Sequence, residues 1–298
     1  MGDPRGRGEE GVPRPGAPLS RPRAWQRPRA SIILAVVIPV ALTIAGSDSS
    51  GGAGIQADLL TFAAFGVHGA SVVTALTAQN SAGIRAIVEV EPGFVAQQID
   101  AVLDDLEVLA AKTGMVYRAA VVAALAERLR ARPLPHLVVD PVLAATTGLS
   151  LAEPAAIATL RDRLLPLATL VTPNLHEAEV LTGRPVSARA DMREAARALL
   201  ALGARAALVT GGHLAGDAVD VLYDGREFRE FSAPRVETRN THGTGCVLSA
   251  AVTAGLALGW GLETAVAAAK RHVTQALATA PGIGQGRGPL NLRYRSMA

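Results

Sequence analysis

The sequence has little cysteine, few aromatic residues and no long charged runs. Its 298 residues include one cysteine, so an internal disulfide is excluded and no oxidising compartment is implied. Aromatic residues make up 3% of the chain, whereas alanine and glycine are abundant, which favours closely packed helices. The six histidines are scattered without zinc-ligand spacing, and no Cys-x-x-Cys pair exists. The composition therefore supports neither a disulfide scaffold nor a zinc site.

The positive charge is concentrated at the amino-terminal end of the chain. The net charge is +3, but residues 1–30 alone hold seven arginines against three acidic residues, so the remainder is slightly acidic. The body of the chain thus lacks the basic excess that nucleic-acid binding needs, and we expect no nucleic-acid partner. Residues 1–30 are rich in Pro, Gly and Arg and have little to bury, which predicts a disordered tail, and we place the end of this tail at residue 38. We expect one domain over residues 39–290.

The apolar stretch that follows this tail raises the question of export. An Arg-rich start before an apolar segment imitates a signal peptide. The stretch 31–46 is too short for a membrane helix, however, and Pro39 divides it. Its second half, 40–45, is better interpreted as a first buried strand that runs into a Gly-rich loop. We therefore expect a cytoplasmic protein with no membrane partner, and secretion is the alternative.

Strand and helix patterns alternate along the body of the chain. Strands are expected at 40–45, 68–79, 84–90, 108–112, 137–142, 168–174 and 206–213, with a hairpin at 219–223 and 227–231. Helices are expected at 55–65, 92–106, 119–129, 154–164, 175–181, 190–202, 244–258 and 262–278. This alternation predicts a parallel sheet with helices on both faces, in which ligands bind beyond the carboxyl ends of the strands.

Polar residues recur at these expected strand ends. They are the loop 46–50, Gln79, Lys112, Asp140, Asn174, Thr210 and the loop 240–246. Gly52-Ala-Gly54 matches a dinucleotide fingerprint weakly, because the acidic residue expected about 20 positions later is missing. There is no P-loop sequence either. The convergence of polar strand ends indicates a small-molecule site of another kind.

The segment Asn240-Thr-His-Gly-Thr-Gly-Cys246 combines two glycines with the start of an apolar helix. A loop of free N–H groups at a helix start binds anions, because the helix dipole is positive there. Cys246 would lie in the first turn, where a thiol has a lowered pKa and can serve as a base. The alternative interpretation is a Gly-capped turn before a packed helix.

Several motifs occur together and in order. They are Leu42-Thr-Ile-Ala-Gly-Ser-Asp-Ser-Ser-Gly-Gly-Ala-Gly-Ile-Gln-Ala-Asp58, Thr77-Ala-Gln-Asn80, Lys112-Thr-Gly-Met115, Val139-Asp-Pro-Val142, Thr172-Pro-Asn-Leu-His-Glu177 and Thr241-His-Gly-Thr-Gly-Cys246. From about residue 40 to 288 the chain resembles the hydroxymethylpyrimidine/phosphomethylpyrimidine kinases of thiamine biosynthesis, in the ribokinase-like superfamily. The resemblance implies an α/β fold, a three-layer α/β/α sandwich with a mostly parallel central sheet. It also implies a homodimer that uses ATP and Mg²⁺ to phosphorylate 4-amino-5-hydroxymethyl-2-methylpyrimidine and then its monophosphate.

The resemblance assigns roles to residues of this chain. It implies that Cys246 is the base and that Gly243, Thr244 and Gly245 form the anion hole. It implies that the pyrimidine is bound by Gln79, Gly46, Asp58, Met115 and Val142. It further implies that ATP is bound by Asn174, Thr210, Gly212 and Thr241 and that Mg²⁺ is held through Glu177 and Asp140. The chemistry of Gln79 agrees, because a carboxamide complements the amino group and ring nitrogen of an aminopyrimidine. Asp58 is equally interpretable as a helix-surface charge, and Glu177 as a first-turn acid favoured by the dipole. We expect His176 and His242 to be exposed loop residues.

One position departs from the family pattern. Thr210 precedes Gly211-Gly-His213, where these enzymes usually carry Lys, and a hydroxyl cannot neutralise phosphate charge. Lys112 or Arg239 could supply the missing cation. Two other functions stay open on the sequence: pyridoxal kinase, which has a similar site, and a non-catalytic pyrimidine-binding or regulatory protein.

Overall fold

The structure is a computed structural model that describes residues 38–144 and 149–293. The expected tail before Ile38 lies outside the described residues. The strands are β1 (Val40–Asp48), β2 (His68–Asn80), β3 (Gly83–Glu89), β4 (Val108–Thr113), β5 (His136–Val139), β6 (Leu170–Val171), β7 (Ala207–Thr210), β8 (Ala218–Tyr223) and β9 (Phe228–Ala233). The helices are α1 (Gly54–Ala64), α2 (Pro92–Asp105), α3 (Ala119–Ala131), α4 (Pro154–Thr159), α5 (Leu175–Thr182), α6 (Arg189–Ala201), α7 (Thr244–Ala257) and α8 (Leu262–Ala278).

The strands form one nine-stranded sheet in the order β3-β2-β1-β4-β5-β6-β7-β8-β9. The six neighbouring strands β2, β1, β4, β5, β6 and β7 pair in parallel. At one edge β3 pairs antiparallel with β2, and at the other edge β8 pairs antiparallel with β7 and β9 with β8. From β1 the chain first adds β2 and β3 on one side and then β4 to β9 on the other, so the strand order reverses direction between β1 and β4. Ligands bind at such a switch point in open α/β sheets.

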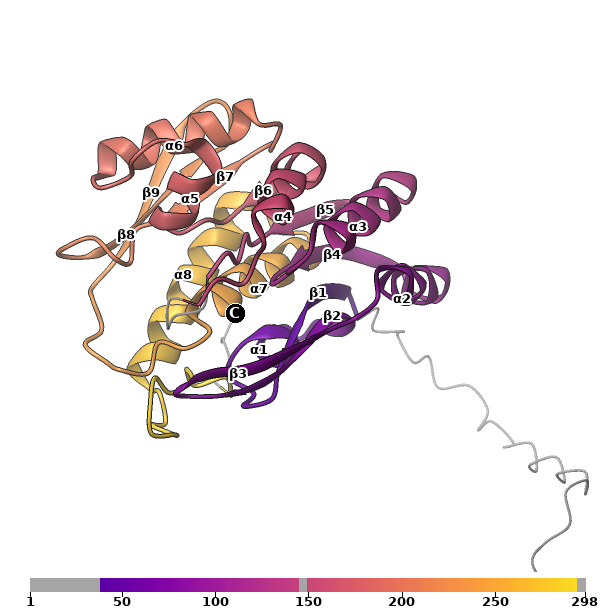
Figure 1. Ribbon diagram of the computed structural model, residues 1–298. Coiled ribbons are helices and arrows are strands. Elements are labelled where there is room, and N and C mark those ends of the chain that lie inside the picture. The colour runs from indigo at the N-terminus through magenta and orange to yellow at the C-terminus, as the bar shows by residue number, and fades with distance from the viewer. Residues whose placement is uncertain (1–37, 145–148, 294–298) are drawn as a thin grey trace, which may run out of the picture. The chain divides into compact units, whose positions relative to one another are not determined.

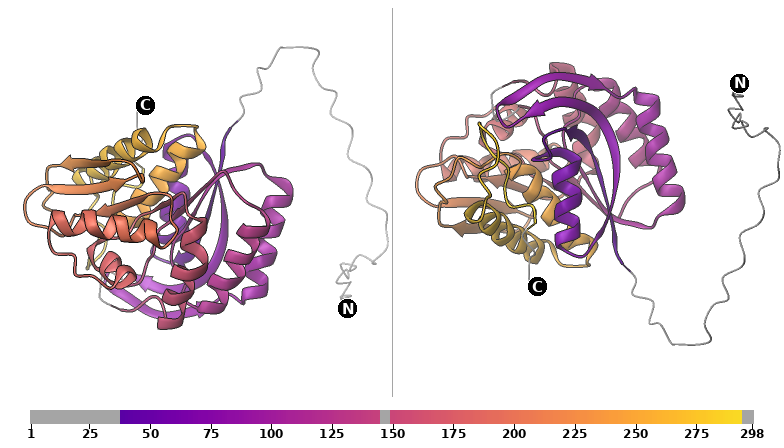
Figure 2. Two further views of the ribbon diagram at one scale, coloured as in Figure 1. Left: turned by 90° about the horizontal axis from the view of Figure 1, so that it is seen from above. Right: turned by 90° about the horizontal axis from the view of Figure 1, so that it is seen from below.

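The helices cover the two faces of this sheet as separate layers. Successive strand residues point to opposite faces, so Leu42 and Ile44 join the core beneath α2 to α6, whereas Ala41 joins the core beneath α1, α7 and α8. Figures 1 and 2 show the two helical layers on either side of the strands. The predicted three-layer α/β/α sandwich with a mostly parallel sheet is confirmed.

Helix α7 packs against β1, β4 and β5 of the sheet and against the helices α1 and α8. Every residue from Val247 to Ala257 is buried, as expected of a helix that is apolar on all sides. Gly255 allows the close contact with α8, because a Cβ there would lie 2.9 Å from the Ala265 Cβ. The start of α7 is thereby fixed beside the carboxyl ends of the central strands.

Several expected elements differ in extent from those observed, among them the strand expected at 206–213, which ends at Thr210. The strand expected at 137–142 ends at Val139, because Asp140 begins a turn with Val142 and Pro141 has no N–H for a sheet bond. The strand expected at 168–174 is confined to Leu170–Val171. The helix expected at 154–164 changes to a π-helical turn after Thr159. None of the helices in the described part of the chain is long and apolar enough to span a membrane.

Candidate active site

A cavity of about 1020 Å³ lies at the carboxyl ends of the strands. Its volume is at the upper end of the roughly 300–1,000 Å³ typical of small-molecule sites, which leaves room for two ligands side by side. Fourteen of the fifteen predicted site residues line it: Gly46, Gln79, Met115, Asp140, Val142, Asn174, Glu177, Thr210, Gly212, Thr241, Gly243, Thr244, Gly245 and Cys246. The fold thus brings together residues that are widely spaced in the sequence.

Asp58 is the predicted site residue that does not line the cavity. It is fully buried in α1, where its carboxylate accepts hydrogen bonds from Lys112 Nζ at 2.9 and 3.0 Å and from Thr43 Oγ1 at 2.6 Å. Burial raises the pKa of Asp58, against the opposing effect of Lys112. Neither the expected contact of Asp58 with substrate nor the alternative of a helix-surface charge agrees with this position. Lys112, fully buried in the same pair, is also withdrawn from the cavity.

The loop before α7 is held by close backbone packing against the first Gly-rich loop. Gly243 has φ of +85°, and a Cβ on it would lie 2.0 Å from the Gly52 carbonyl oxygen, so only glycine fits. The Thr244 hydroxyl donates to the Thr241 carbonyl oxygen at 2.7 Å. Helix α7 therefore starts at the cavity wall, where the N–H groups of a helix start can bind an anion.

The Cys246 thiol lies in the first turn of α7 and is half-buried at the cavity. Burial raises the pKa of this thiol to about 12, although the Lys112 ammonium and a hydrogen bond from the Gly54 N–H favour the thiolate. The lowered pKa expected from a helix start is therefore wrong, because desolvation outweighs the dipole. At neutral pH the group is therefore a protonated thiol, and its thiolate is a strong base.

Two buried carboxyl groups, those of Asp140 and Glu177, interact electrostatically beside this loop. Burial and the charge of Asp140 raise the pKa of Glu177 to about 8. Burial likewise raises the pKa of Asp140, whose Oδ2 accepts a hydrogen bond from the Ser249 hydroxyl at 2.9 Å. That oxygen lies 4.0 Å from the position of a Cβ on Gly245. A cation would therefore relieve this charge next to the anion loop.

Asn174 and Glu177 also form a capping box at the start of α5. The Glu177 N–H donates to Asn174 Oδ1 and the Asn174 N–H donates to Glu177 Oε2, both at 2.9 Å. This arrangement satisfies two helix-start N–H groups and fixes the carboxylate at the cavity. The capping role suggested by its first-turn position and a role at the cavity are thus compatible.

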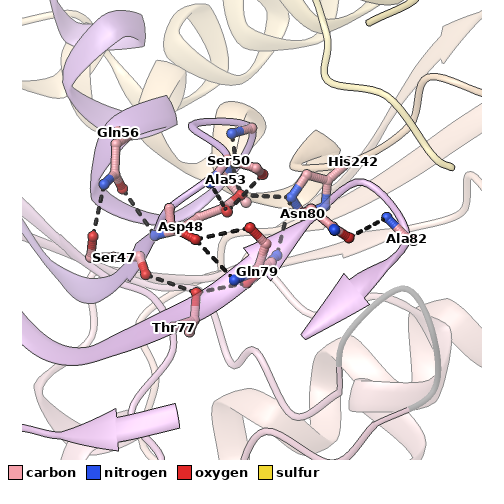
Figure 3. A network of polar contacts seen from close by, with 12 residues as sticks. Ser47, Asp48, Ser50, Ala53, Gln56, Thr77, Gln79, Asn80, Ala82 and His242 are labelled. Atoms are coloured by element: carbon pink, nitrogen blue, oxygen red, sulfur yellow. Dashed lines mark hydrogen bonds and ion pairs between the residues drawn. The ribbon is translucent and has the colours of Figure 1, made fainter. Parts of the chain in front are cut away.

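Gln79 belongs to a polar network that sequence reasoning only partly identified (Figure 3). His242 Nε2 lies 2.7 Å from Asp48 Oδ2 and 3.2 Å from Gln79 Nε2, and the side chain of His242 is only 14% exposed. The expectation of an exposed loop histidine is therefore wrong. Asp48 was missed as an individual residue, although its place in the opening motif, at the end of β1, was a signal for it.

Three further cations line the cavity near β7 and the segments that follow it. Arg235 donates to the carbonyl oxygens of Gly212, Leu214 and Gly216, so its charge stabilises the loop after β7. Lys270 pairs with Asp220 at 2.7 Å. Arg239 is exposed at the cavity and has no side-chain hydrogen bond within residues 38–144 and 149–293. Of the two cations expected to compensate for Thr210, Arg239 is thus the one at the cavity.

Comparisons with known proteins agree with this geometry. The family model described as phosphomethylpyrimidine kinase matches residues 48–291. The hydroxymethylpyrimidine/phosphomethylpyrimidine kinase of Rhizobium meliloti is 53% identical over 260 residues, which cover 86% of this chain and 97% of that protein. The thiamine biosynthesis bifunctional protein ThiED of Geobacter sulfurreducens is 51% identical over 84% of this chain, and the match spans about half, 51%, of its length.

A solved structure supports the fold assignment as well. The ADP complex of Bacillus subtilis pyridoxal kinase superposes with a TM-score of 0.80 at 39% identity, over 85% of this chain and 97% of that one. The predicted ribokinase-like α/β fold is therefore confirmed. From the family model and the identity to whole relatives, the chain belongs to the phosphomethylpyrimidine kinase family.

Proposed function

We propose that this protein transfers the γ-phosphoryl group of ATP to the hydroxymethyl group of 4-amino-5-hydroxymethyl-2-methylpyrimidine, and then a second one to the monophosphate, in thiamine biosynthesis. The single observation that carries the proposal is that Gln79, Cys246 and the start of α7 line one cavity. This transfer needs a side chain that recognises the aminopyrimidine, a base and an anion-binding loop, and Gln79, Cys246 and the start of α7 fit these three roles.

In the proposed reaction, Cys246 first releases its thiol proton to solvent, and the thiolate sulfur then takes the proton of the substrate hydroxyl. The hydroxyl oxygen attacks the γ-phosphorus, the bond to the bridging oxygen breaks, and ADP leaves with that electron pair. The backbone N–H groups of Gly243, Thr244 and Gly245 stabilise the charge that develops on the transferred group. Because the thiol pKa is raised to about 12, the thiolate is a minor species at neutral pH, and the nearby Lys112 charge favours it.

Mg²⁺ fits the two carboxyl groups near this loop. Within the described residues, no group of three or more His, Cys, Asp or Glu could hold a metal ion alone. A Mg²⁺ ion needs only one or two carboxylates when ATP phosphates and water complete its shell, and there it neutralises phosphate charge. Glu177 and Asp140, whose pKa values are raised by burial, are the groups that would hold it. Asn174, Thr210, Gly212 and Thr241 are proposed to bind the nucleotide.

The test is ATP turnover with two alcohols, the aminopyrimidine and pyridoxal. We expect the aminopyrimidine to be the preferred substrate and to yield a diphosphate as final product. Preference for pyridoxal would favour pyridoxal kinase activity, and binding without turnover would favour a regulatory protein. Gln79→Ala should weaken pyrimidine use by about 1–3 kcal/mol, because ring groups lose their partners, and leave the KM for ATP unchanged.

We further propose that the protein is a cytoplasmic homodimer, because its reaction consumes ATP and because β2 and β3 present an apolar surface. Leu76 and Val88 are directly opposite each other on these strands and are 51% and 65% exposed. A second copy of the chain would cover this pair. Sedimentation of a Leu76→Arg variant tests this: a dimer that persists would exclude this surface as the interface.

A further inference from the structure

The network at Gln79 determines which end of its amide faces which neighbour. Asp48 Oδ2 accepts from the N–H groups of Gly52 and Ala53, and Oδ1 accepts from the N–H and hydroxyl of Ser50. Burial alone would raise the pKa of Asp48, but hydrogen bonds from His242 and Ser50 hold it below its ordinary value. Asp48 is therefore an ionised acceptor, surrounded by donors.

The ionised Asp48 carboxylate determines which ring nitrogen of His242 carries a proton. His242 Nε2 lies 2.7 Å from Asp48 Oδ2, and a carboxylate oxygen without a proton can only accept. Nε2 must therefore carry a proton and donate it to Asp48. A protonated ring nitrogen has no lone pair to accept from the Gln79 amide, so an NH2 group 3.2 Å away would place two N–H donors against each other, whereas an amide oxygen there can share the Nε2 proton with Asp48.

The opposite end of the amide leads to the same conclusion. Thr77 Oγ1 lies 3.0 Å from the Ser47 carbonyl oxygen and 3.0 Å from the far amide atom of Gln79. A hydroxyl has a single proton, and the Ser47 carbonyl oxygen can only accept it. If the amide nitrogen faces Thr77, the hydroxyl donates to Ser47 and accepts from Gln79, and every proton has one acceptor. The two amide ends have the same size, so hydrogen bonding assigns them.

We propose that His242, fixed by Asp48, is a positioning residue that turns the Gln79 carboxamide so that Oε1 faces His242 and Nε2 faces Thr77. This orientation is the reverse of the one described above, in which Nε2 is the amide atom 3.2 Å from His242 and Oε1 the one 3.0 Å from Thr77. Oε1 then lies on the side of His242, which precedes α7, and Nε2 lies on the side of Thr77 in β2 (Figure 3). Each amide atom can make one further hydrogen bond, because a carbonyl oxygen accepts two and an amide nitrogen carries two protons. The amide is thus oriented before a ligand arrives.

The consequence for the ligand rests on the proposed function. In 4-amino-5-hydroxymethyl-2-methylpyrimidine the amino group is flanked by a ring nitrogen and by the carbon that bears the hydroxymethyl group. An acceptor on the α7 side draws the amino group there, so the hydroxymethyl group points further toward α7 and Cys246. With the reversed amide, the same two hydrogen bonds would direct the hydroxymethyl group away from the base. The amide orientation therefore selects the productive orientation of the ring.

The first test needs no substrate. In ¹⁵N-labelled wild-type protein, a long-range ¹H–¹⁵N histidine spectrum, assigned by comparison with His242→Ala, should show a proton on Nε2 of His242. An Nε2 proton in either the neutral or the charged ring supports the proposal, whereas a proton on Nδ1 alone overturns it. This measurement stands even if the protein phosphorylates neither alcohol, an outcome that would overturn the proposed function instead.

The second test compares kcat/KM for the aminopyrimidine alcohol and for 5-hydroxymethyl-2-methylpyrimidine, which lacks the amino group. His242→Ala should reduce the preference for the aminopyrimidine about tenfold, as expected for loss of one hydrogen-bonded anchor, while the KM for ATP is unchanged. His242→Gln, whose amide N–H can replace Nε2–H, should restore most of the preference. His68→Ala, an exposed histidine at the far end of β2, is the matched control. An unchanged preference in His242→Ala overturns the proposal.

Discussion

Two carboxylates on either side of the first Gly-rich loop each pair with a side-chain nitrogen, and the two pairs differ in burial and in the pKa of the carboxyl group. Asp58, after the loop, pairs with Lys112, and both side chains are fully buried. Asp48, before the loop, pairs with His242 at the cavity wall, where Gln79 completes the network. Burial raises the pKa of Asp58 despite Lys112, whereas the hydrogen bonds at Asp48 lower its pKa despite burial.

The position of each pair therefore decides whether it contributes mainly to the stability of the fold or to recognition of a ligand. A buried pair has no water to replace a missing partner, so its removal affects folding first. A pair at a cavity wall is connected by hydrogen bonds to side chains that can contact the ligand, so its removal affects ligand recognition first. The predictions below test this division, and the first concerns the buried pair.

Lys112→Met should destabilise the folded protein by about 3–5 kcal/mol, because the Asp58 carboxylate would be left buried without its partner. The measurement is urea unfolding at neutral pH. A Lys112→Met/Asp58→Leu double variant should recover part of the loss, since no charge would then remain unpaired. If the single variant lost less than 1 kcal/mol, the contrast between the two pairs would disappear.

Cys246→Ser should lower kcat by about 10²-fold, the usual scale for loss of a general base. ATP binding should persist, because the contacts of the loop before α7 are backbone N–H groups. Cys246→Asp should retain part of the activity, since the resemblance implies that related kinases use a carboxylate there. Alkylation at this single cysteine should inactivate the protein, with ATP and pyrimidine protecting it. Wild-type turnover by Cys246→Ser would leave Cys246 as a packing residue.

The pH dependence of kcat should report the raised thiol pKa. A base with a pKa of about 12 is mostly protonated at neutral pH, so its active fraction increases about tenfold per pH unit as the pH rises. We expect log kcat to increase with pH from 7 to 9 without a plateau. A plateau that begins near pH 7 would show that the thiol titrates lower, and Cys246→Asp provides the comparison because a carboxylate is already ionised there.

Arg239→Ala should raise the KM for ATP about tenfold with little change in kcat, because an exposed charge contributes uniform binding of phosphate. Thr210→Lys should lower that KM by supplying the cation that the family usually carries. Arg226→Ala, exposed in the turn between β8 and β9, is the matched control. An unchanged KM in Arg239→Ala would show that Thr210 has no compensating arginine.

Deletion of residues 1–30 should have the smallest effect. The composition of this segment offers little to bury, so we expect activity and melting temperature to stay nearly unchanged. Thermal unfolding and ATP turnover of the truncated protein measure this. A large drop in either would show that the segment contributes to the domain.

Much of the site could be predicted because its residues occupy the ends of expected strands. Gln79 follows an alternating strand, and Asn174 follows an apolar one, so the rule for ligands in parallel sheets already places them at one edge. Asp58 could not be placed in this way. A helix residue adjacent to a Gly-rich loop can face the cavity or the core, and the choice depended on Lys112, which is distant in sequence.

By itself, the sequence determined the alternation of strands and helices, the Gly-rich loops and the chemistry that can gather at the strand ends, because these follow from local periodicity and residue type. Tertiary structure decided the pairing of His242 with Asp48, the withdrawal of Asp58 and Lys112 into the core, and the raised pKa of Cys246. Each of these depends on burial and on contacts between distant segments, and neither burial nor such contacts are encoded in local spacing.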